Sequence, residues 1–237
     1  MNKIILTLIG LIIFFSISGQ EVQKLNYQLN FGTSISFPYN KTVETLTEFE
    51  EHPIVNYTSG YDYFAEFIFI YNLNKRMTLN TGVSFINSKL HVKSTVARIE
   101  KDGIERNNYL GIPVEFNYQI FEKIPLRIGL GAYLNLLLKS QEKGTMYIDT
   151  NGFSIYYPDP LLESMEIVQD YENDITDNYN PLDFGLSTKV EYEFKFANNV
   201  SIVLFSKFNY GLTNTRKESS TIVWKNYILL FGLGVKI

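Results

Sequence analysis

The chain has 237 residues, enough for one large domain or two small ones. Hydrophobic residues make up 45% and aromatic residues 15%, but charged residues only 19%, below the ~25% of ordinary soluble proteins. The net charge of −4 and the lack of any basic run argue against a nucleic-acid partner, and the absence of cysteine excludes disulfides and thiolate metal sites.

Residues 1–19, MNKIILTLIGLIIFFSISG, predict a secretory signal peptide. Lys3 supplies the positive start, residues 4–15 form the apolar region, and Ser16, Ser18 and Gly19 are the small residues that precede a cleavage site. The apolar region is shorter than the ~20 residues that a membrane-spanning helix needs. We therefore expect an exported chain whose barrel domain covers residues 20–237.

From residue 24 onward, apolar and polar residues alternate with a period of two, which is typical of β-strands with two different faces. Eight segments show this pattern, at residues 24–37, 61–72, 76–86, 109–120, 123–140, 182–194, 200–212 and 226–237. One face of each segment is apolar, and the opposite face is polar and rich in glycine.

The links between these segments alternate in length. Those at residues 73–75, 121–125 and 195–199 are short, whereas those at 38–60, 87–108, 140–181 and 213–225 are long and polar. An even number of strands with short turns at one end and long loops at the other is typical of outer-membrane barrels. We expect an all-β fold: an eight-stranded antiparallel up-and-down transmembrane β-barrel with both termini periplasmic and the long loops extracellular.

A soluble β-sandwich or lipocalin-like barrel is the alternative, since its strands also alternate. The apolar faces run for about ten residues, the length of a tilted membrane strand. Aromatic residues such as Tyr27 and Tyr71 lie near the short turns, and others such as Tyr61 and Tyr227 lie near the long loops. Two aromatic belts are typical of the two membrane interfaces, so the pattern favours a membrane barrel whose apolar faces contact lipid.

Charged residues of both signs fall on the face that points into the predicted lumen. Eight strands leave an interior that side chains can fill. The pattern therefore predicts a salt-bridge network that plugs the barrel, and a narrow ion path is the alternative. The expected members are Glu66, Glu115, Arg127, Lys139, Asp183, Lys189, Glu191 and Lys207.

The sequence contains no motif that indicates catalysis. The two histidines, His52 and His91, fall in predicted outer loops without a metal-binding spacing, and no nucleophile motif such as G-x-S-x-G occurs. Alternating acids at Asp170, Glu172 and Asp174 resemble the start of a calcium loop but lack its later glycine and glutamate. We expect a protein that is not an enzyme and has no cofactor or metal.

The loop at residues 140–181 contains exposed apolar residues that predict a contact surface, unless they fold back over the barrel mouth. These residues are Tyr156, Tyr157, Leu161, Leu162 and Met165.

Residues 109–138, YLGIPVEFNYQIFEKIPLRIGLGAYLNLLL, resemble the signature of the PorT-like outer-membrane β-barrel proteins of Bacteroidota. The resemblance rests on a Tyr-Leu-x-Ile-Pro opening at Tyr109–Pro113 and on a glycine-rich strand that ends in Tyr133 and Asn135. The segments DFGLSTKVEYEF and YGLTNT are similar to later strands of that family.

The resemblance implies an outer-membrane barrel, and for the name-giving member a role in type IX secretion and gliding. We therefore expect a scaffold or binding surface, with outer-membrane lipid and other envelope or secretion proteins as partners. A small pore or transport accessory is the alternative.

Overall fold

The computed structural model describes residues 25–42, 54–96, 99–149, 166–197, 200–217 and 222–237. The predicted signal peptide at residues 1–19 lies outside the described residues, as do His52 and the proposed contact residues of loop 140–181. The described part of the chain contains no helix of the length and apolarity that crossing a membrane requires.

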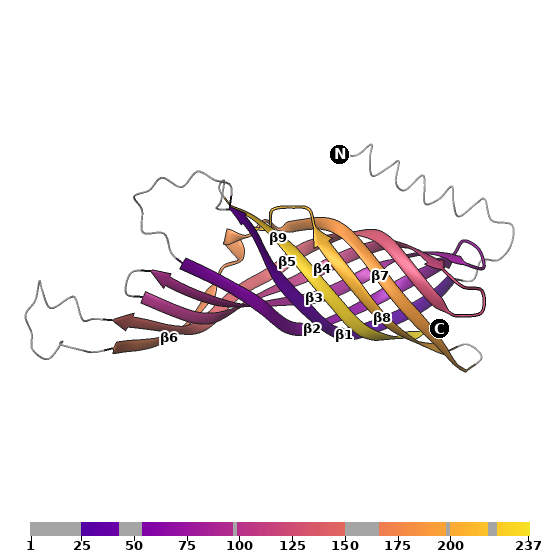
Figure 1. The fold of residues 1–237 in the computed structure, drawn as a ribbon, viewed down its shortest axis with the longest axis horizontal. Coiled ribbons are helices and arrows are strands. Elements are labelled where there is room, and N and C mark those ends of the chain that lie inside the picture. Colours follow the sequence, from indigo (N-terminus) through magenta and orange to yellow (C-terminus); the bar gives the residue numbers. More distant parts are fainter. Residues whose placement is uncertain (1–24, 43–53, 97–98, 150–165, 198–199, 218–221) are drawn as a thin grey trace, which may run out of the picture.

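Eight antiparallel strands form a closed ring (Figure 1). They are β1 (Leu25–Thr42), β2 (Ile54–Asn72), β3 (Met77–Val96), β4 (Ile99–Gln119), β5 (Leu126–Asp149), β7 (Leu182–Ala197), β8 (Val200–Gly211) and β9 (Ile222–Lys236). Each strand pairs with its neighbour in the chain, β5 pairs with β7, and β1 pairs with β9. The pairing of β1 with β9 closes the ring, so the barrel has no free edge within the apolar band. This confirms the predicted fold class.

The outer face of the barrel is a continuous apolar band, because the outward residues of every strand are the apolar members of the alternating pattern. Leu29, Ile112 and Leu130 are 51%, 53% and 65% exposed. Aromatic rings pair near both ends of the band, with centroids of Tyr27 and Phe69 at 5.8 Å and those of Tyr210 and Tyr227 at 4.8 Å. A surface of this kind is stable against lipid and not against water.

The strands are longer than the sequence pattern predicts. Residues 87–96 and 99–108, expected as an outer loop, continue β3 and β4, and β5 continues to Asp149. The reason is that the buried positions beyond the lipid are largely polar, such as Glu105 and Asn107, so the alternation of hydrophobicity ends while the backbone pairing continues. Lys93 and Asp102, for example, form a cross-strand ion pair at 2.9 Å there.

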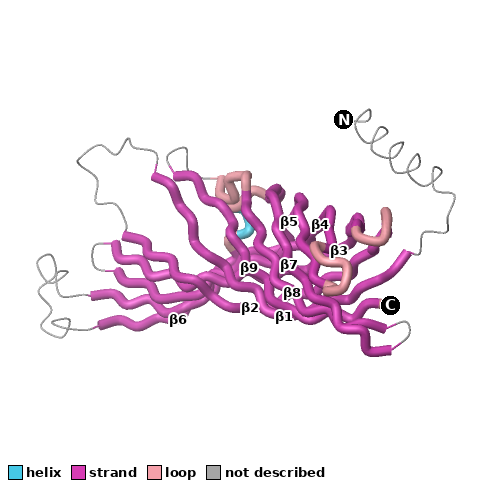
Figure 2. Tube along the Cα trace, turned by 45° about the vertical axis from the view of Figure 1, so that its right-hand side comes forward, coloured by secondary structure: helices cyan, strands magenta, loops and turns pink. Residues whose placement is uncertain are grey.

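The ring divides into two projections at its long-loop end, as Figure 2 shows. β1 and β2 stop pairing at Ser36 and Gly60, whereas β1 and β9 stay paired as far as Thr42 and Ile222. We call residues 37–42 and 222–227 the β1–β9 ribbon.

The other projection, which we call the extension sheet, consists of residues 54–59 of β2, 88–96 of β3, 99–107 of β4, 140–149 of β5, and β6 (Glu166–Asp174). Within the described chain β6 pairs with β5 alone, so it is the edge strand of this sheet. After β6, the 3-10 helix η2 (Thr176–Asn178) leads back to β7.

Candidate functional site

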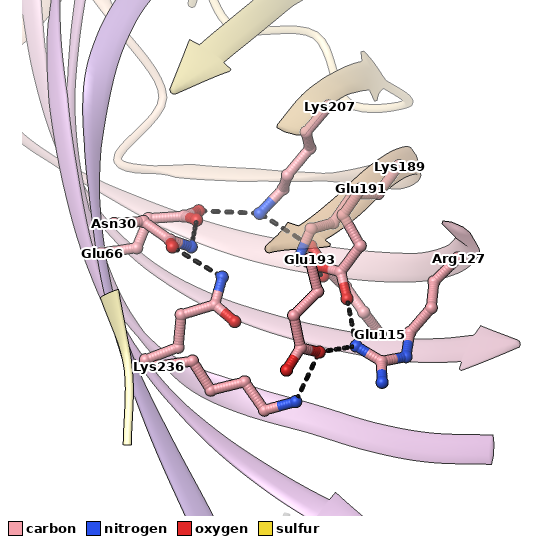
Figure 3. Close-up of polar contacts among 10 residues, drawn as sticks. Asn30, Glu66, Glu115, Arg127, Lys189, Glu191, Glu193, Lys207 and Lys236 are labelled. Carbon is pink, nitrogen blue, oxygen red and sulfur yellow. Dashed lines mark hydrogen bonds and ion pairs between the residues drawn. The ribbon is translucent and has the colours of Figure 1, made fainter. Parts of the chain in front are cut away.

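A chain of ion pairs crosses the interior of the barrel and reaches its short-turn end (Figure 3). Six of the eight ring strands contribute to it, and all of its side chains lie on the inward faces of those strands. We call this set the ion-pair chain; its members are Glu66, Glu115, Arg127, Lys189, Glu191, Glu193, Lys207 and Lys236.

Lys207 of β8 is the centre of this chain. Its Nζ lies 2.7 Å from Oε1 of Glu66 on β2 and 2.8 Å from Oε1 of Glu115 on β4. The amide Nδ2 of Asn30 donates a hydrogen bond of 3.1 Å to the other oxygen of Glu66. These charged side chains are at most 3% exposed, so each needs its partner to offset the cost of leaving water.

The chain continues toward the short-turn end through β7. Lys189 lies 2.7 Å from Glu191 and 3.6 Å from Glu115. Arg127 then lies 2.6 Å from Glu193, which also pairs with Lys236 at 2.8 Å. The chain therefore contains four cations and four carboxylates, and its formal charge is zero.

A layer of apolar side chains lies on the long-loop side of Glu66 and Lys207. We call Phe64, Ile86, Ile228 and Leu230 the apolar layer, and each is at most 1% exposed. The ring of Phe205 packs against Phe64 with centroids 5.9 Å apart, and Lys189 lies 5.3 Å from the Phe205 ring. The expectation that the inward face is polar and glycine-rich is therefore wrong at this level, where apolar side chains from several strands meet.

Gly232 makes room for these rings. A Cβ atom at this position would lie 2.8 Å from Phe64, 2.9 Å from Phe205 and 2.6 Å from the carbonyl oxygen of Phe31. The small residue on β9 is thus a requirement of the packing inside the barrel.

An open cavity of about 650 Å³ lies at the short-turn end. Arg127 and Glu193 line it, together with residues of the turns such as Lys75 and Lys123. Arg127 is 14% exposed at the lower end of the chain, whereas Lys207 is 2% exposed at its centre. Solvent therefore reaches the ion-pair chain from the short-turn end.

The structure brings six of the eight predicted lumen residues into the chain. Asp183 is also buried, but it lies apart from the chain, where Thr213 donates at 2.8 Å and Asn226 at 3.1 Å to its carboxylate. The expected lumen position of Lys139 is wrong. Asn108 pairs with Lys139 and Tyr109 with Leu137, so Leu138 is an extra residue in β5, and this bulge leaves Lys139 exposed.

Sequence reasoning missed Glu193 and Lys236 as members of the chain. The alternating pattern could have predicted both as inward-facing, because Glu193 stands between the apolar-face residues Tyr192 and Phe194, and Lys236 stands between Val235 and Ile237. Within the described residues, no group of three or more histidine, aspartate or glutamate side chains has the arrangement of a metal site.

A family model described as an outer membrane protein beta-barrel domain matches residues 19–217. No curated protein sequence matches the chain.

Among solved structures, OprG from Pseudomonas aeruginosa is 7% identical, with a TM-score of 0.48 over 91% of this chain and 97% of that one. AlkL in DMPC lipid bilayers is 11% identical, with a TM-score of 0.44 over 93% of each chain. Ail of Yersinia pestis, in complex with the heparin analogue sucrose octasulfate, is 14% identical, with a TM-score of 0.38 over 90% and 99%. Because these three TM-scores are all below 0.5, the fold is established by the strand pairing alone.

Proposed function

The chain belongs to the family of outer membrane proteins with a β-barrel domain, and from this premise we propose that it is a non-enzymatic scaffold or binding surface. It is a protein of the cell outer membrane. We place the short turns and both chain ends on the periplasmic side and the two projections at the cell surface, in agreement with the usual arrangement of such barrels.

The observation that carries the proposal is the filled interior. A hydrated ion on its way through the barrel would have to separate buried ion pairs and then cross the apolar layer. Separating a buried pair costs several kcal/mol, since each charge is left without a partner in a medium of low polarity. An interior of this kind favours a structural role of the barrel, with the projections as the part that meets other molecules.

The extension sheet supports the binding role, because it carries exposed apolar residues beyond the lipid band. Ile167 and Val168 of β6 are 45% and 58% exposed, and they pair with Ile148 and Tyr147 at the end of β5 beyond the ring. Exposed apolar groups on an exported surface are typical of protein contacts.

The class of partner is the finer part of the proposal. The resemblance of residues 109–138 to PorT-like barrels of Bacteroidota supports a partner in a secretion or surface assembly, such as type IX secretion and gliding. The scaffold role itself does not depend on that resemblance.

Affinity purification after crosslinking in native outer membranes tests this function. We expect a stoichiometric envelope protein to purify with the tagged chain and to be lost from the double variant Ile167→Ser, Val168→Ser. Lys143→Ser is the matched control, since Lys143 is exposed on the neighbouring strand of the same sheet. Retention of the partner by the double variant, or its loss from the control, would count against a contact through β6.

A small pore is the second candidate, favoured by the charged lumen and the open cavity at the short-turn end. Planar-bilayer recording of the double variant Glu115→Gln, Arg127→Gln distinguishes the two functions. If the ion-pair chain plugs a pore, removal of both charges should raise the conductance above that of the wild type. Equal conductance of the two proteins leaves the pore without support.

A further inference from the structure

The long-loop end of the barrel contains a second cluster that the ion-pair chain does not include. Three aromatic rings and a carboxylate surround the guanidinium of Arg216, which lies between β8 and β9. We call the surrounding side chains the aromatic box; they are Tyr57 of β2, Glu105 of β4, Tyr179 after η2, and Trp224 of β9.

The geometry of the box is that of a cation site. The Cζ atom of Arg216 lies 4.5 Å from the ring centroid of Trp224, 5.1 Å from that of Tyr179 and 5.2 Å from that of Tyr57. Cations within ~6 Å of an aromatic centroid are attracted by the ring face. Nη2 of Arg216 donates to Glu105, as does the hydroxyl of Tyr179, so a charge-assisted hydrogen bond adds orientation to the ring contacts.

The electrostatics of the box match a single positive charge. Burial acts to lower the pKa of Arg216, but Glu105 and the two tyrosines outweigh it and raise that pKa above its usual range. Burial raises the pKa of Tyr179, with Glu105 adding to the effect, so this phenol stays neutral at ordinary pH. Glu105 therefore supplies the one negative charge, and its side chain is only 3% exposed.

The walls of the box are held together by the backbone, independently of the Arg216 side chain. Asn180 N–H donates to the carbonyl of Thr215 at 2.8 Å, and Lys217 N–H donates to that of Asn178 at 2.9 Å. Thr215 N–H donates to the carbonyl of Trp224 at 2.9 Å. A variant that lacks the arginine side chain should therefore keep the box, with a buried carboxylate that has lost its cation.

We propose that the aromatic box is a guanidinium-binding site at the cell surface, in which Arg216 is an internal ligand that exchanges with the guanidinium group of an external cationic molecule. Planar N–H donors satisfy both the rings and Glu105, whereas a quaternary ammonium ion satisfies the rings alone. The site thus selects guanidinium over other monovalent cations.

Trp224 is the only tryptophan of the chain, so its fluorescence reports on the box directly. The test titrates methylguanidinium into the full-length protein in lipid vesicles, at concentrations far below those that denature. We expect a saturable change in emission for Arg216→Ala. Its half-saturating methylguanidinium concentration should be at least about tenfold below that of the wild type, because in the wild type the Arg216 side chain occupies the site for most of the time. Tetramethylammonium and sodium should give no saturable change.

Two variants control the interpretation. Arg216→Ala, Glu105→Gln should lose the response, because the carboxylate that holds the cation has become neutral. Arg106→Ala should behave as wild type, since Arg106 is exposed and pairs with Asp62 outside the box.

The proposed site is wrong if Arg216→Ala folds but shows no saturable fluorescence response to methylguanidinium. It is also wrong if the double variant Arg216→Ala, Glu105→Gln responds as strongly as Arg216→Ala. If methylguanidinium saturates the fluorescence change of Arg216→Ala but never changes that of the wild type, the proposed exchange of Arg216 with an external guanidinium is wrong. If Arg216→Ala does not fold, the wild-type arm decides: the exchange requires a saturable response to methylguanidinium and none to tetramethylammonium.

Discussion

Substitution of Lys207 by methionine tests the energetic role of the ion-pair chain. The change shortens the side chain by one heavy atom and removes the cation that bridges Glu66 of β2 and Glu115 of β4, at 2.7 Å and 2.8 Å. Glu115 keeps Lys189 at 3.6 Å, whereas within the described residues Glu66 keeps the amide of Asn30 alone. Removing one partner of a buried pair costs about 3–5 kcal/mol, and these side chains are too buried for solvent screening to reduce that figure.

The assay is urea unfolding of the barrel in lipid vesicles, followed by Trp224 fluorescence. We expect Lys207→Met to lower the free energy of unfolding by about 3–5 kcal/mol, and Lys207→Met, Glu66→Gln to recover at least half of the loss. Lys143→Met is the control, since Lys143 and Glu172 form an exposed pair at 3.9 Å whose loss should cost less than about 1 kcal/mol. A loss for Lys207→Met no larger than that of the control would refute the reasoning.

Three further predictions concern other parts of the barrel. Phe64→Ala should lower the free energy of unfolding by about 3–5 kcal/mol through the cavity that it leaves, and it should raise bilayer conductance. A conductance equal to that of the wild type would contradict the sealing role of the apolar layer. Gly232→Val should reduce the folded fraction seen as heat-modifiable mobility in gels, because its Cβ would lie 2.6 Å from the carbonyl oxygen of residue 31; wild-type yield would show that the rings can move aside. Thr176→Val should raise the pKa of Asp174 toward its usual value, since the Thr176 hydroxyl donates to that carboxylate at 2.6 Å and holds its pKa low. Carbon NMR titration measures this pKa, and an unchanged value would assign the effect to the backbone N–H of Thr176.

The lipid-facing half of the barrel could be predicted from the sequence because lipid imposes one rule on every outward residue. Leu130 and Ile112 must be apolar wherever their strands cross the membrane, so a period of two identifies both strand and face. The inward face obeys no such rule. Phe64 and Phe205 fill space beside Gly232, whereas Glu66 and Lys207 fill space beside each other, and either arrangement fills the interior.

The candidate site shows the same limit. Alternation placed Lys189 and Glu191 inside, but their partners depend on which strands face each other across the ring. The bulge at Leu138 reverses the sides of the residues that follow, and so it turned Lys139 outward without any signal in the local pattern. The aromatic box was missed because Arg216 and Glu105 lie outside the apolar band, where burial along β4 still alternates but hydrophobicity does not follow it.

The edge strand β6 has a consequence for how copies of this protein coexist in the membrane. Among the described residues this nine-residue strand pairs on one side alone, and such an edge is a template on which a second chain can add. Its outward positions carry Asp170, Glu172 and Asp174, and the strand contains no lysine or arginine. Two such edges repel each other at the short distances where salt does not screen them. In a crowded membrane, where all copies share one orientation, we expect this repulsion to disfavour the joining of neighbouring barrels into sheets.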